Sequence, residues 1–319
     1  MTFKKHMIEL LKSEVEKKRI LLIDGNDKRS LEAAINHKKD NYIKPILLLE
    51  DHDEMIESQI STIVISDYKN RKEELVELYL SKRNGKETKE QAEKVVFLPN
   101  YFGMLMLELG EVEGVVGGLE FPTSQILSPA FKIIKPKPNV NVISSVMIME
   151  KDDEHYLFSD ISVIPYPTQE QLVDIAINSS NFAKQINFKE KVAFLSFSTS
   201  GSAKHELAQK VKHATEQFNK TYKPQYKALG EIQFDAALSM DIRNKKYKEN
   251  GFDGKPTIFV FPSLDSGNIG YKIAQGLGGY GAIGPIITGL NKPVNDLSRG
   301  STSNDVYNTM MITAIQAKK

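Results

Sequence analysis

The residues best suited to chemistry lie near the end of the chain, in the segment NKPVNDLSRGSTSNDVYNTM, residues 291–310. Ser298 and Arg299 precede Asp305, and Asp305 begins an apolar helical pattern. Helix capping explains Asp305, because a residue just before it can serve as N-cap and its carboxylate suits the helix dipole. Capping does not explain Arg299. The alternative is a site in which Arg299 binds an anion and Asp305 accepts a proton.

A second candidate cation, Arg29, stands in the segment IDGNDKRSLEAA, where a short apolar run gives way to a helix. The N-terminal end of a helix favours anions, so a cation in the first turn gains nothing from the helix dipole. Arg29 is therefore either an ordinary surface arginine or a ligand for a bound anion.

Two further segments combine glycines with small polar residues. In SFSTSGSAKHE, the polar side chains are Ser198, Thr199 and Ser202. Free backbone N–H groups there would form a phosphate cradle, and the alternative is that Ser202 is an ordinary N-cap. In FPSLDSGNIGYKIAQGLGG, Asn268 lies in a loop with clustered glycines, which let the backbone approach a ligand closely. The spacing is not GxGxxG, so a dinucleotide fingerprint is not indicated.

Short apolar runs predict the strands that position these loops. The expected strands are residues 20–23, 46–49, 62–66, 95–98, 192–197 and 257–261. Helices are expected at residues 169–186 and 202–219, the second with Leu207, Val211, Ala214 and Phe218 on its buried face.

The alternation of strands and helices predicts an α/β fold with a largely parallel sheet, in which sites form at the carboxyl ends of the strands. The prolines of KPKP, residues 135–138, predict a hinge between two halves of similar size. The lysine-rich stretch 82–94 is typical of a solvated helix face or loop.

Composition excludes several classes of function. The chain has 319 residues, 40% of them hydrophobic, which suffices for two domains with buried cores. Its 42 basic and 41 acidic residues give no reason to expect nucleic acid or an anionic membrane as a partner. The absence of cysteine excludes disulfides, thiolate metal sites and a cysteine nucleophile. The first residues lack the apolar region of a signal peptide, and no apolar run is long enough to span a bilayer, so a cytoplasmic protein is expected.

The second half of the chain resembles the phosphate acetyltransferases, within the phosphate acetyl/butyryl transferase family. The segments LSFSTSGSAK, GEIQFDAAL, FVFPSLDSGNIGYKIAQ, AIGPIITGLNKPVNDLSRG and DVYNTMMITAIQA follow that family's order. The first half is similar more loosely, through RILLIDGNDKRSLEAA, NYFGMLMLELGEVEGVVGG and PAFKIIK. Together these segments extend the resemblance over most of the chain.

The resemblance implies two α/β/α domains with a cleft between them, similar to isocitrate and isopropylmalate dehydrogenases. The first domain would be residues 1–137 plus 288–319 and the second residues 138–287, with the active site in the cleft. The implied reaction is reversible transfer of an acetyl group between coenzyme A and inorganic phosphate in a ternary complex, with acetyl phosphate as the other partner. The family implies a homodimer with no tightly bound cofactor, in which coenzyme A or acetyl-CoA is a substrate.

The resemblance also assigns roles to residues. Asp305 would be the general base, and Ser298 and Arg299 would be catalytic. A thiol with a pKa of about 8.5 is mostly protonated at pH 7, so a carboxylate that takes its proton helps the sulfur attack the acetyl carbon. Arg299 would bind phosphate oxygens, and Ser298 would stabilise the oxyanion or orient the thiol. The expected substrate-binding residues are Arg29, Arg83, Ser198, Thr199, Ser202 and Asn268.

The sequence departs from the family pattern in GLEFPTSQILSPA, residues 118–130. Phe121 stands at the position of a histidine, and Ser128 at that of an arginine that helps to hold the phosphate. A charge-assisted hydrogen bond contributes about 1.5–3 kcal/mol, so its loss predicts weaker binding of the anion unless Lys132 or Arg83 replaces it. Ser200 also replaces a lysine of the family.

These departures leave alternatives open. One is a phosphate acyltransferase for a longer chain such as butyryl. Another is a non-catalytic relative that binds coenzyme A or a protein partner. A nicotinamide-dependent dehydrogenase of similar fold is disfavoured, because the aspartate cluster that such enzymes use for a metal is not evident.

Overall fold

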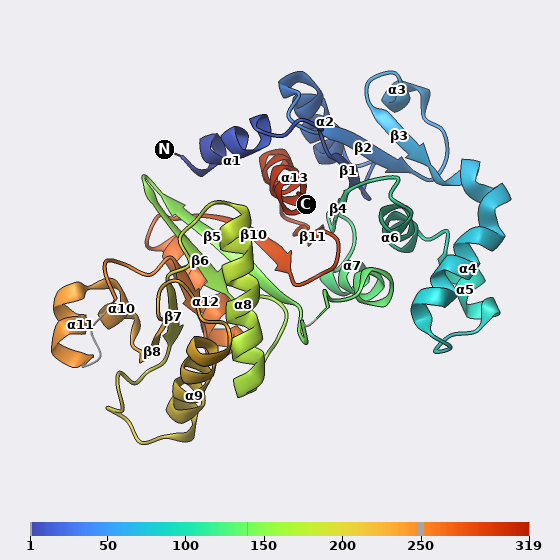
Figure 1. The fold of residues 1–319 in the computed structure, drawn as a ribbon. Coiled ribbons are helices and arrows are strands. Elements are labelled where there is room, and N and C mark those ends of the chain that lie inside the picture. The colour runs from blue at the N-terminus through green and yellow to red at the C-terminus, as the bar shows by residue number, and fades with distance from the viewer. Residues whose placement is uncertain (1, 139, 248–251, 319) are drawn as a thin grey trace. The chain divides into compact units, whose positions relative to one another are not determined.

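The computed structural model describes residues 2–138, 140–247 and 252–318. By its internal contacts the chain divides into two compact units. We call Lys4–Pro138 with Leu290–Lys319 the terminal unit, and Asn139–Gly289 with Met1–Phe3 the central unit. Each unit has its own sheet flanked by helices (Figure 1), which confirms the predicted α/β class.

The sheet of the terminal unit has five parallel strands in the order β11-β4-β1-β2-β3. Their bounds are β1 Arg19–Leu22, β2 Lys44–Leu49, β3 Ser61–Val64, β4 Gly114–Gly117 and β11 Val294–Asp296. The register pairs Leu22 with Val116 and Gly117 with Asp296. Because the strands are parallel, the carboxyl ends of β1, β4 and β11 meet at one edge of the sheet, where the strand order reverses between β1 and β4.

Helices connect these strands and cover the sheet. They are α1 Phe3–Lys12, α2 Lys28–Asp40, α3 Glu54–Glu57, η1 Ile65–Arg71, α4 Lys72–Arg83, α5 Lys89–Val95, α6 Pro99–Leu109, α7 Thr123–Pro129, η2 Ala130–Ile134 and α13 Ser303–Gln316. The last helix, α13, packs against α2, β1, β4 and β11, and all its residues from Val306 to Ile315 are buried. A helix that is buried on every side lies inside its unit, so α13 is part of the core of the terminal unit.

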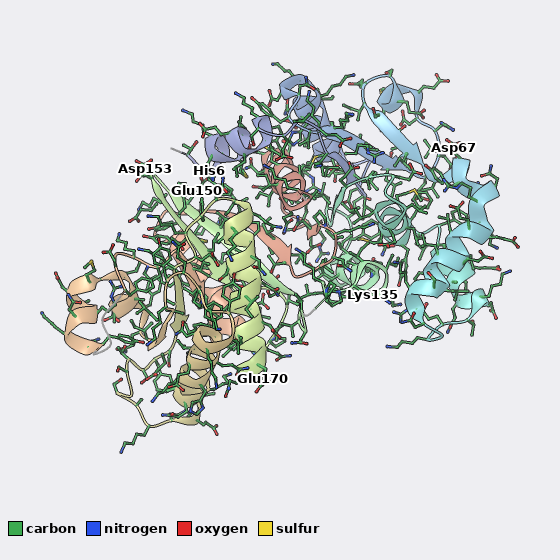
Figure 2. All side chains as sticks on the ribbon, in the orientation of Figure 1. His6, Asp67, Lys135, Glu150, Asp153 and Glu170 are labelled. Carbon is green, nitrogen blue, oxygen red and sulfur yellow. The ribbon has the colours of Figure 1, made fainter. Side chains whose placement is uncertain are left out.

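The chain leaves and rejoins the terminal unit at one place. Lys135, labelled in Figure 2, has a φ of 64° and its carbonyl accepts a hydrogen bond from Asn291 N–H. Pro136 and Leu290 form an isolated antiparallel bridge beside it. The two prolines that predicted a hinge therefore lie at the last residues of Lys4–Pro138, directly before the boundary between the units.

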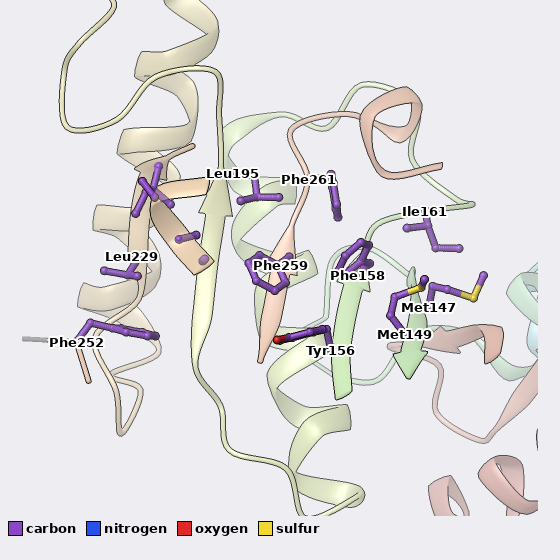
Figure 3. Close-up of a cluster of buried hydrophobic side chains, with 14 residues drawn as sticks. Met147, Met149, Tyr156, Phe158, Ile161, Leu195, Leu229, Phe252, Phe259 and Phe261 are labelled. Atoms are coloured by element: carbon purple, nitrogen blue, oxygen red, sulfur yellow. The ribbon is translucent and has the colours of Figure 1, made fainter. Parts of the chain in front are cut away.

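The central unit has a six-stranded mixed sheet in the order β10-β5-β6-β9-β7-β8, in which β10, β5 and β6 pair antiparallel and the others parallel. Its elements are β5 Ser144–Lys151, β6 Glu154–Ser159, α8 Gln169–Gln185, β7 Val192–Leu195, α9 Glu206–Thr221, β8 Leu229–Ile232, α10 Phe234–Leu238, α11 Met240–Lys246, β9 Ile258–Val260, α12 Leu264–Gly276 and β10 Gly281–Thr288. An aromatic cluster of β6 and β9 residues, with Phe158 and Phe259 at its centre, lies in the core on one face of this sheet (Figure 3).

Five of the six predicted strands are present, and the sixth is wrong. Residues 95–98 form the last residue of α5 and the turn that leads to α6. Thr88 and Gln91 make a capping box that starts α5, and Pro99 then takes the first position of α6, where its missing N–H costs nothing. An apolar run between two helices thus gave a false strand signal.

Two local predictions about helices are also wrong, and a third is confirmed only in part. Helix α9 begins at Glu206, with His205 as N-cap, and not at residue 202; Leu207 is half exposed and Ala208 is buried in its place. The glycines near Asn268 lie within α12 and not in a loop. In the stretch 82–94, Lys82 and Arg83 are partly buried and paired with glutamates, whereas the lysines at 89 and 94 are exposed as expected.

Candidate active site

The loop before α13 brings together the residues that the sequence singled out. Ser298 and Arg299 are exposed, and the turn is closed by Ser298 N–H donating to Ser301 Oγ (3.1 Å) and Gly300 N–H donating to Ser298 Oγ (3.2 Å). Ser298 therefore uses its hydroxyl oxygen as an acceptor within the turn and keeps its O–H free to donate outward. Within the described part of the chain, the guanidinium group of Arg299 makes no hydrogen bond or ion pair.

Asp305 is the third residue of α13 and takes part in its N-terminal cap. The N-cap is Thr302, and not residue 303 or 304 as the sequence suggested. Thr302 donates from its N–H and its Oγ1 to Asp305 Oδ2, both at 2.8 Å. The other carboxylate oxygen, Oδ1, makes no hydrogen bond to the residues that the structure describes. Capping thus fixes the direction of the carboxylate and leaves one of its oxygens able to accept a proton.

Arg29 links the start of α2 to the loop before α13. Its Nε and Nη2 donate to the carboxylate of Asp27 at 3.0 and 2.6 Å, and its Nη1 donates to the carbonyls of Arg299 (2.8 Å) and Ser301 (2.9 Å). The hydrogen bonds that Arg29 donates to the Asp27 carboxylate hold the pKa of Asp27 below its usual range. The structure therefore shows Arg29 fixing the backbone of the loop that carries Arg299. That Arg29 also binds an anion stays a prediction.

Two buried aspartates lie where β1, β4 and β11 end. Asp24 is 4% exposed and accepts hydrogen bonds from the N–H groups of Gly118 (2.8 Å), Leu119 (3.2 Å) and Glu120 (3.0 Å). Asp296 is 2% exposed and accepts a hydrogen bond from Thr123 Oγ1 (2.6 Å). Burial raises the pKa of Asp24 against the effect of its three donors, and raises the pKa of Asp296 to about 7.

The two departures from the family pattern in residues 118–130, Phe121 and Ser128, leave the helix in this segment intact. Phe121 lines a small cavity together with Asp24 and Glu120. Ser128 is exposed on α7. Lys132, one helical turn after Ser128, forms an ion pair with Glu87 (3.2 Å) and donates to the hydroxyl of a tyrosine, Tyr101.

Arg83 contacts the same glutamate, since its Nε lies 3.1 Å from Glu87 Oε1. Burial alone would raise the pKa of Glu87, but hydrogen bonds from Tyr79 and Lys132 and the nearby charges hold this pKa below its usual value. Both cations considered as substitutes for the lost arginine are thus paired with Glu87 in this structure. A role for Arg83 in substrate binding stays a prediction.

In the central unit, the loop after β7 is closed on itself around Glu231. The carboxylate accepts from Gly201 N–H (2.6 Å) and from Ser198 Oγ (3.2 Å), and Ser198 Oγ accepts from Ala203 N–H (3.1 Å). Ser202 is not an N-cap: its Oγ accepts from the N–H of Thr199 at 3.0 Å. Several N–H groups expected to be free for a phosphate are therefore engaged inside the loop.

Asn268 ties α12 to the segment after β6. Its Nδ2 donates to the carbonyl of Ile161 at 3.1 Å, and its Oδ1 accepts from Lys272 at 2.6 Å. The preceding residue is a glycine because a Cβ at Gly267 would come within 2.3 Å of the carbonyl oxygen of Asp160. Substrate binding by Asn268, Ser198, Thr199 and Ser202 stays a prediction.

Sequence comparison decides the family. A model described as phosphate acetyl/butaryl transferase matches residues 2–314. This chain belongs to the phosphate acetyl/butaryl transferase family. A phosphate acetyltransferase from Staphylococcus epidermidis is 43% identical over 310 residues, which is 94% of either chain.

Two solved structures are similar to this chain over nearly its whole length. A phosphotransacetylase from Streptococcus pyogenes has a TM-score of 0.90 at 38% identity and covers 99% of both chains. The EutD phosphotransacetylase from Staphylococcus aureus has a TM-score of 0.89 at 38% identity and covers 100% of both. The resemblance inferred from the motifs is therefore confirmed.

The described residues contain neither a metal-binding cluster nor a helix that could cross a membrane. No cluster of histidine, aspartate and glutamate side chains among residues 2–138, 140–247 and 252–318 could hold a metal ion. Within the same ranges, every helix is too short or too polar to cross a membrane.

The sequence reasoning missed four acidic residues that shape these loops: Asp24, Glu87, Glu231 and Asp296. Each of these carboxylates accepts hydrogen bonds either from residues distant in the sequence or from the backbone of a loop. No spacing pattern in the sequence therefore predicts its role. Asp296 alone had a signal, because it directly precedes the LSRG motif in NDLSRG.

Proposed function

We propose that this chain is a phosphate acetyltransferase, which reversibly converts acetyl-CoA and inorganic phosphate into acetyl phosphate and coenzyme A. The observation that carries the proposal is similarity to a phosphate acetyltransferase over 94% of the chain at 43% identity. The arrangement of Ser298, Arg299 and Asp305 supports it, since the three residues lie in one turn and the cap that follows.

In the proposed reaction, Asp305 accepts the thiol proton of coenzyme A through its unengaged Oδ1. The sulfur then forms a bond to the acetyl carbonyl carbon of acetyl phosphate, and the bond from that carbon to the phosphate oxygen breaks. Arg299 binds the departing phosphate, and the Ser298 hydroxyl donates to the carbonyl oxygen as negative charge develops there. In the reverse direction the protonated Asp305 returns its proton to the sulfur.

The deciding experiment mixes purified protein with coenzyme A and acetyl phosphate and follows thioester formation. Arg299→Ala and Asp305→Asn are the test variants, and the second keeps an oxygen that can accept the hydrogen bonds from Thr302. General-base and electrostatic assistance are each worth about 10²–10⁴-fold, so both variants should lose at least two orders of magnitude in kcat. Arg71→Ala is the control, because Arg71 pairs with Glu74 on the surface of the same unit and makes no contact with the turn.

Folded wild-type protein without turnover would contradict the proposal. Turnover with butyryl phosphate but not acetyl phosphate would instead indicate the longer acyl substrate. Binding of coenzyme A without turnover of either would indicate a non-catalytic role.

We also propose the finer assignments that the family resemblance implies. The terminal and central units would be the two domains, residues 1–137 plus 288–319 and residues 138–287. The protein would be a cytoplasmic homodimer with coenzyme A as substrate and no tightly bound cofactor. Analytical ultracentrifugation tests the dimer, and the absorbance spectrum and mass of the native protein test for a bound cofactor.

A further inference from the structure

The carboxyl group of Asp296 is buried and the proposed reaction does not use it. It ends β11, two residues before Ser298. Its Oδ2 accepts the hydrogen bond from Thr123, the first residue of α7. Its Oδ1 is also buried and has no hydrogen-bond partner within the described residues. A buried carboxyl group with one donor for two oxygens is costly, which suggests a role beyond packing.

Gly118 follows Gly117, the strand partner of Asp296, and lies against the Asp296 carboxyl group. Its φ is +118°, and a Cβ built on it would lie 2.5 Å from Asp296 Oδ1 and 2.5 Å from the carbonyl oxygen of Leu297. Leu297 N–H in turn donates to Gly117 at 2.7 Å. The loop after β4 and the loop after β11 are therefore in contact at Asp296, with no space between them for a methyl group.

The backbone N–H of Gly118 donates a hydrogen bond to the second buried acid, Asp24. Asp24 accepts three backbone N–H groups of the β4 loop, which favours its charged form. Asp296 has only Thr123 as a donor, and burial together with the nearby Asp24 disfavours its charge. Two carboxylates sharing one buried site cannot both ionise without mutual repulsion.

Few other charged groups belong to the elements packed around Asp296. The strand β4 (GVVG) and the helix α7 (TSQILSP) contain no titratable side chain. Helix α13 contains two titratable residues, Asp305 near its start and Tyr307. The hydroxyl of Tyr307 donates to Asp40. In β1 and the loop after it, Asp24 is the residue whose charge raises the pKa of Asp296.

We propose that Asp296 is a positioning residue for the acetyl transfer, which, through its hydrogen bond with Thr123, holds the loop of Ser298 and Arg299 against the loop that follows β4. This inference rests on the proposed function. With Asp296 protonated, the site holds one negative charge, on Asp24, and the two loops stay in contact. Ionisation of Asp296 strengthens the hydrogen bond from Thr123 but places a second negative charge near Asp24 in a buried site. The repulsion between the two carboxylates then loosens the contact between the loops.

The test compares Thr123→Val, which is isosteric and removes the hydroxyl, with Thr123→Ser, which keeps it, and adds Asp296→Asn and the double variant. Thr123→Val should lower kcat by about tenfold with little change in KM for coenzyme A, and Thr123→Ser should restore kcat to within about twofold of wild type. Asp296→Asn should keep kcat near that of wild type at pH 6, because its amide oxygen can still accept the hydrogen bond from Thr123. The double variant should be as slow as Thr123→Val, because the missing hydroxyl already removes this contact.

The pH profile gives a readout that packing alone would not change. In wild type, kcat should decline as the pH rises above about 7, where Asp296 ionises. In Asp296→Asn, the ratio of kcat between pH 6 and pH 9 should lose this decline, because the amide cannot ionise. A decline of equal size in both proteins, or equal kcat in Thr123→Val and wild type, would overturn the inference.

Hydrogen exchange separates this inference from the proposed function. The amides of residues 298–304 should exchange faster in Thr123→Val than in Thr123→Ser, whether or not the protein turns over acetyl phosphate. If the wild type shows no turnover but the two variants differ in exchange, the proposed function is wrong and the loop contact is supported. Turnover in wild type with identical exchange in the two variants would overturn the positioning role.

Discussion

Replacing Arg29 by lysine should loosen the loop that carries Arg299. Arg29 uses two edges of its guanidinium group, one for the carboxylate of Asp27 and the other for the carbonyls of Arg299 and Ser301. A lysine keeps the charge but has a single ammonium group, which cannot fill both positions. The ion pair with Asp27 can survive in the variant, whereas the two hydrogen bonds to the loop are lost together.

The size of the effect follows from these contacts. Two hydrogen bonds at about 0.5–1.5 kcal/mol each give about 1–3 kcal/mol. The side chain of Arg29 is 31% exposed, so water can replace part of what is lost, and about 1–2 kcal/mol remains. That free energy corresponds to a change of about 5–30-fold in the population of the ordered loop. We expect kcat/KM for acetyl phosphate to fall by the same factor.

The assay combines steady-state kinetics with hydrogen exchange of the amides at residues 298–304. Arg29→Lys should speed exchange there and lower kcat, whereas Arg71→Lys, on a surface pair with Glu74, should change neither. If Arg29 mainly binds the substrate anion, Arg29→Lys should raise KM for acetyl phosphate and leave exchange in the unliganded protein unchanged. That second pattern would refute the reasoning that Arg29 acts by fixing the loop.

Three further substitutions test other parts of the structure. Gly118→Ala should destabilise the fold by about 2–5 kcal/mol in urea unfolding, through a strained φ and a Cβ contact of 2.5 Å, whereas Gly85→Ala, with a positive φ but open space, should cost only about 1 kcal/mol. His37 is buried, and burial lowers its pKa to about 4. The stability that it contributes as a neutral residue is therefore complete above pH 6.5 and declines by up to about 3 kcal/mol as the pH falls to 4. His37→Gln should flatten this part of the curve of unfolding free energy against pH. Glu231→Gln should speed amide exchange at Gly201 by about tenfold, because a charge-assisted hydrogen bond becomes a neutral one, and unchanged exchange would show that the loop after β7 is held by other contacts.

The strands predicted from the sequence were those made of uninterrupted apolar residues. The runs that became β1, β2 and β7 are buried almost throughout, as parallel strands covered on both faces should be. Two of the strands that were missed have other patterns. Strand β4 is GVVG and strand β11 is VND, and both are too short and too poor in large apolar residues to be recognised alone. They are strands because neighbours on the sheet complete their hydrogen bonds.

The site could be predicted in part. Residue types and helix-start signals were enough to single out Arg299 and Asp305, and the family motif added their roles. They could not show that Arg29 lies against Arg299, since 270 residues separate them in the sequence. Nor could they show that Glu87 pairs with both Arg83 and Lys132, because that contact depends on how α4 and η2 pack.

The buried contacts also change how the divergent loop should be understood. From the sequence, the loss of an arginine at Ser128 suggested that residues 118–130 act on phosphate binding through a missing charge. In the structure Ser128 is exposed, and the contact from this segment to the LSRG loop runs from Thr123 to Asp296. In the proposed arrangement, the neutral hydroxyl of Thr123 positions Arg299 through Asp296. If so, exchanging residues in this segment should alter kcat through the order of the loop, before it alters the affinity for phosphate.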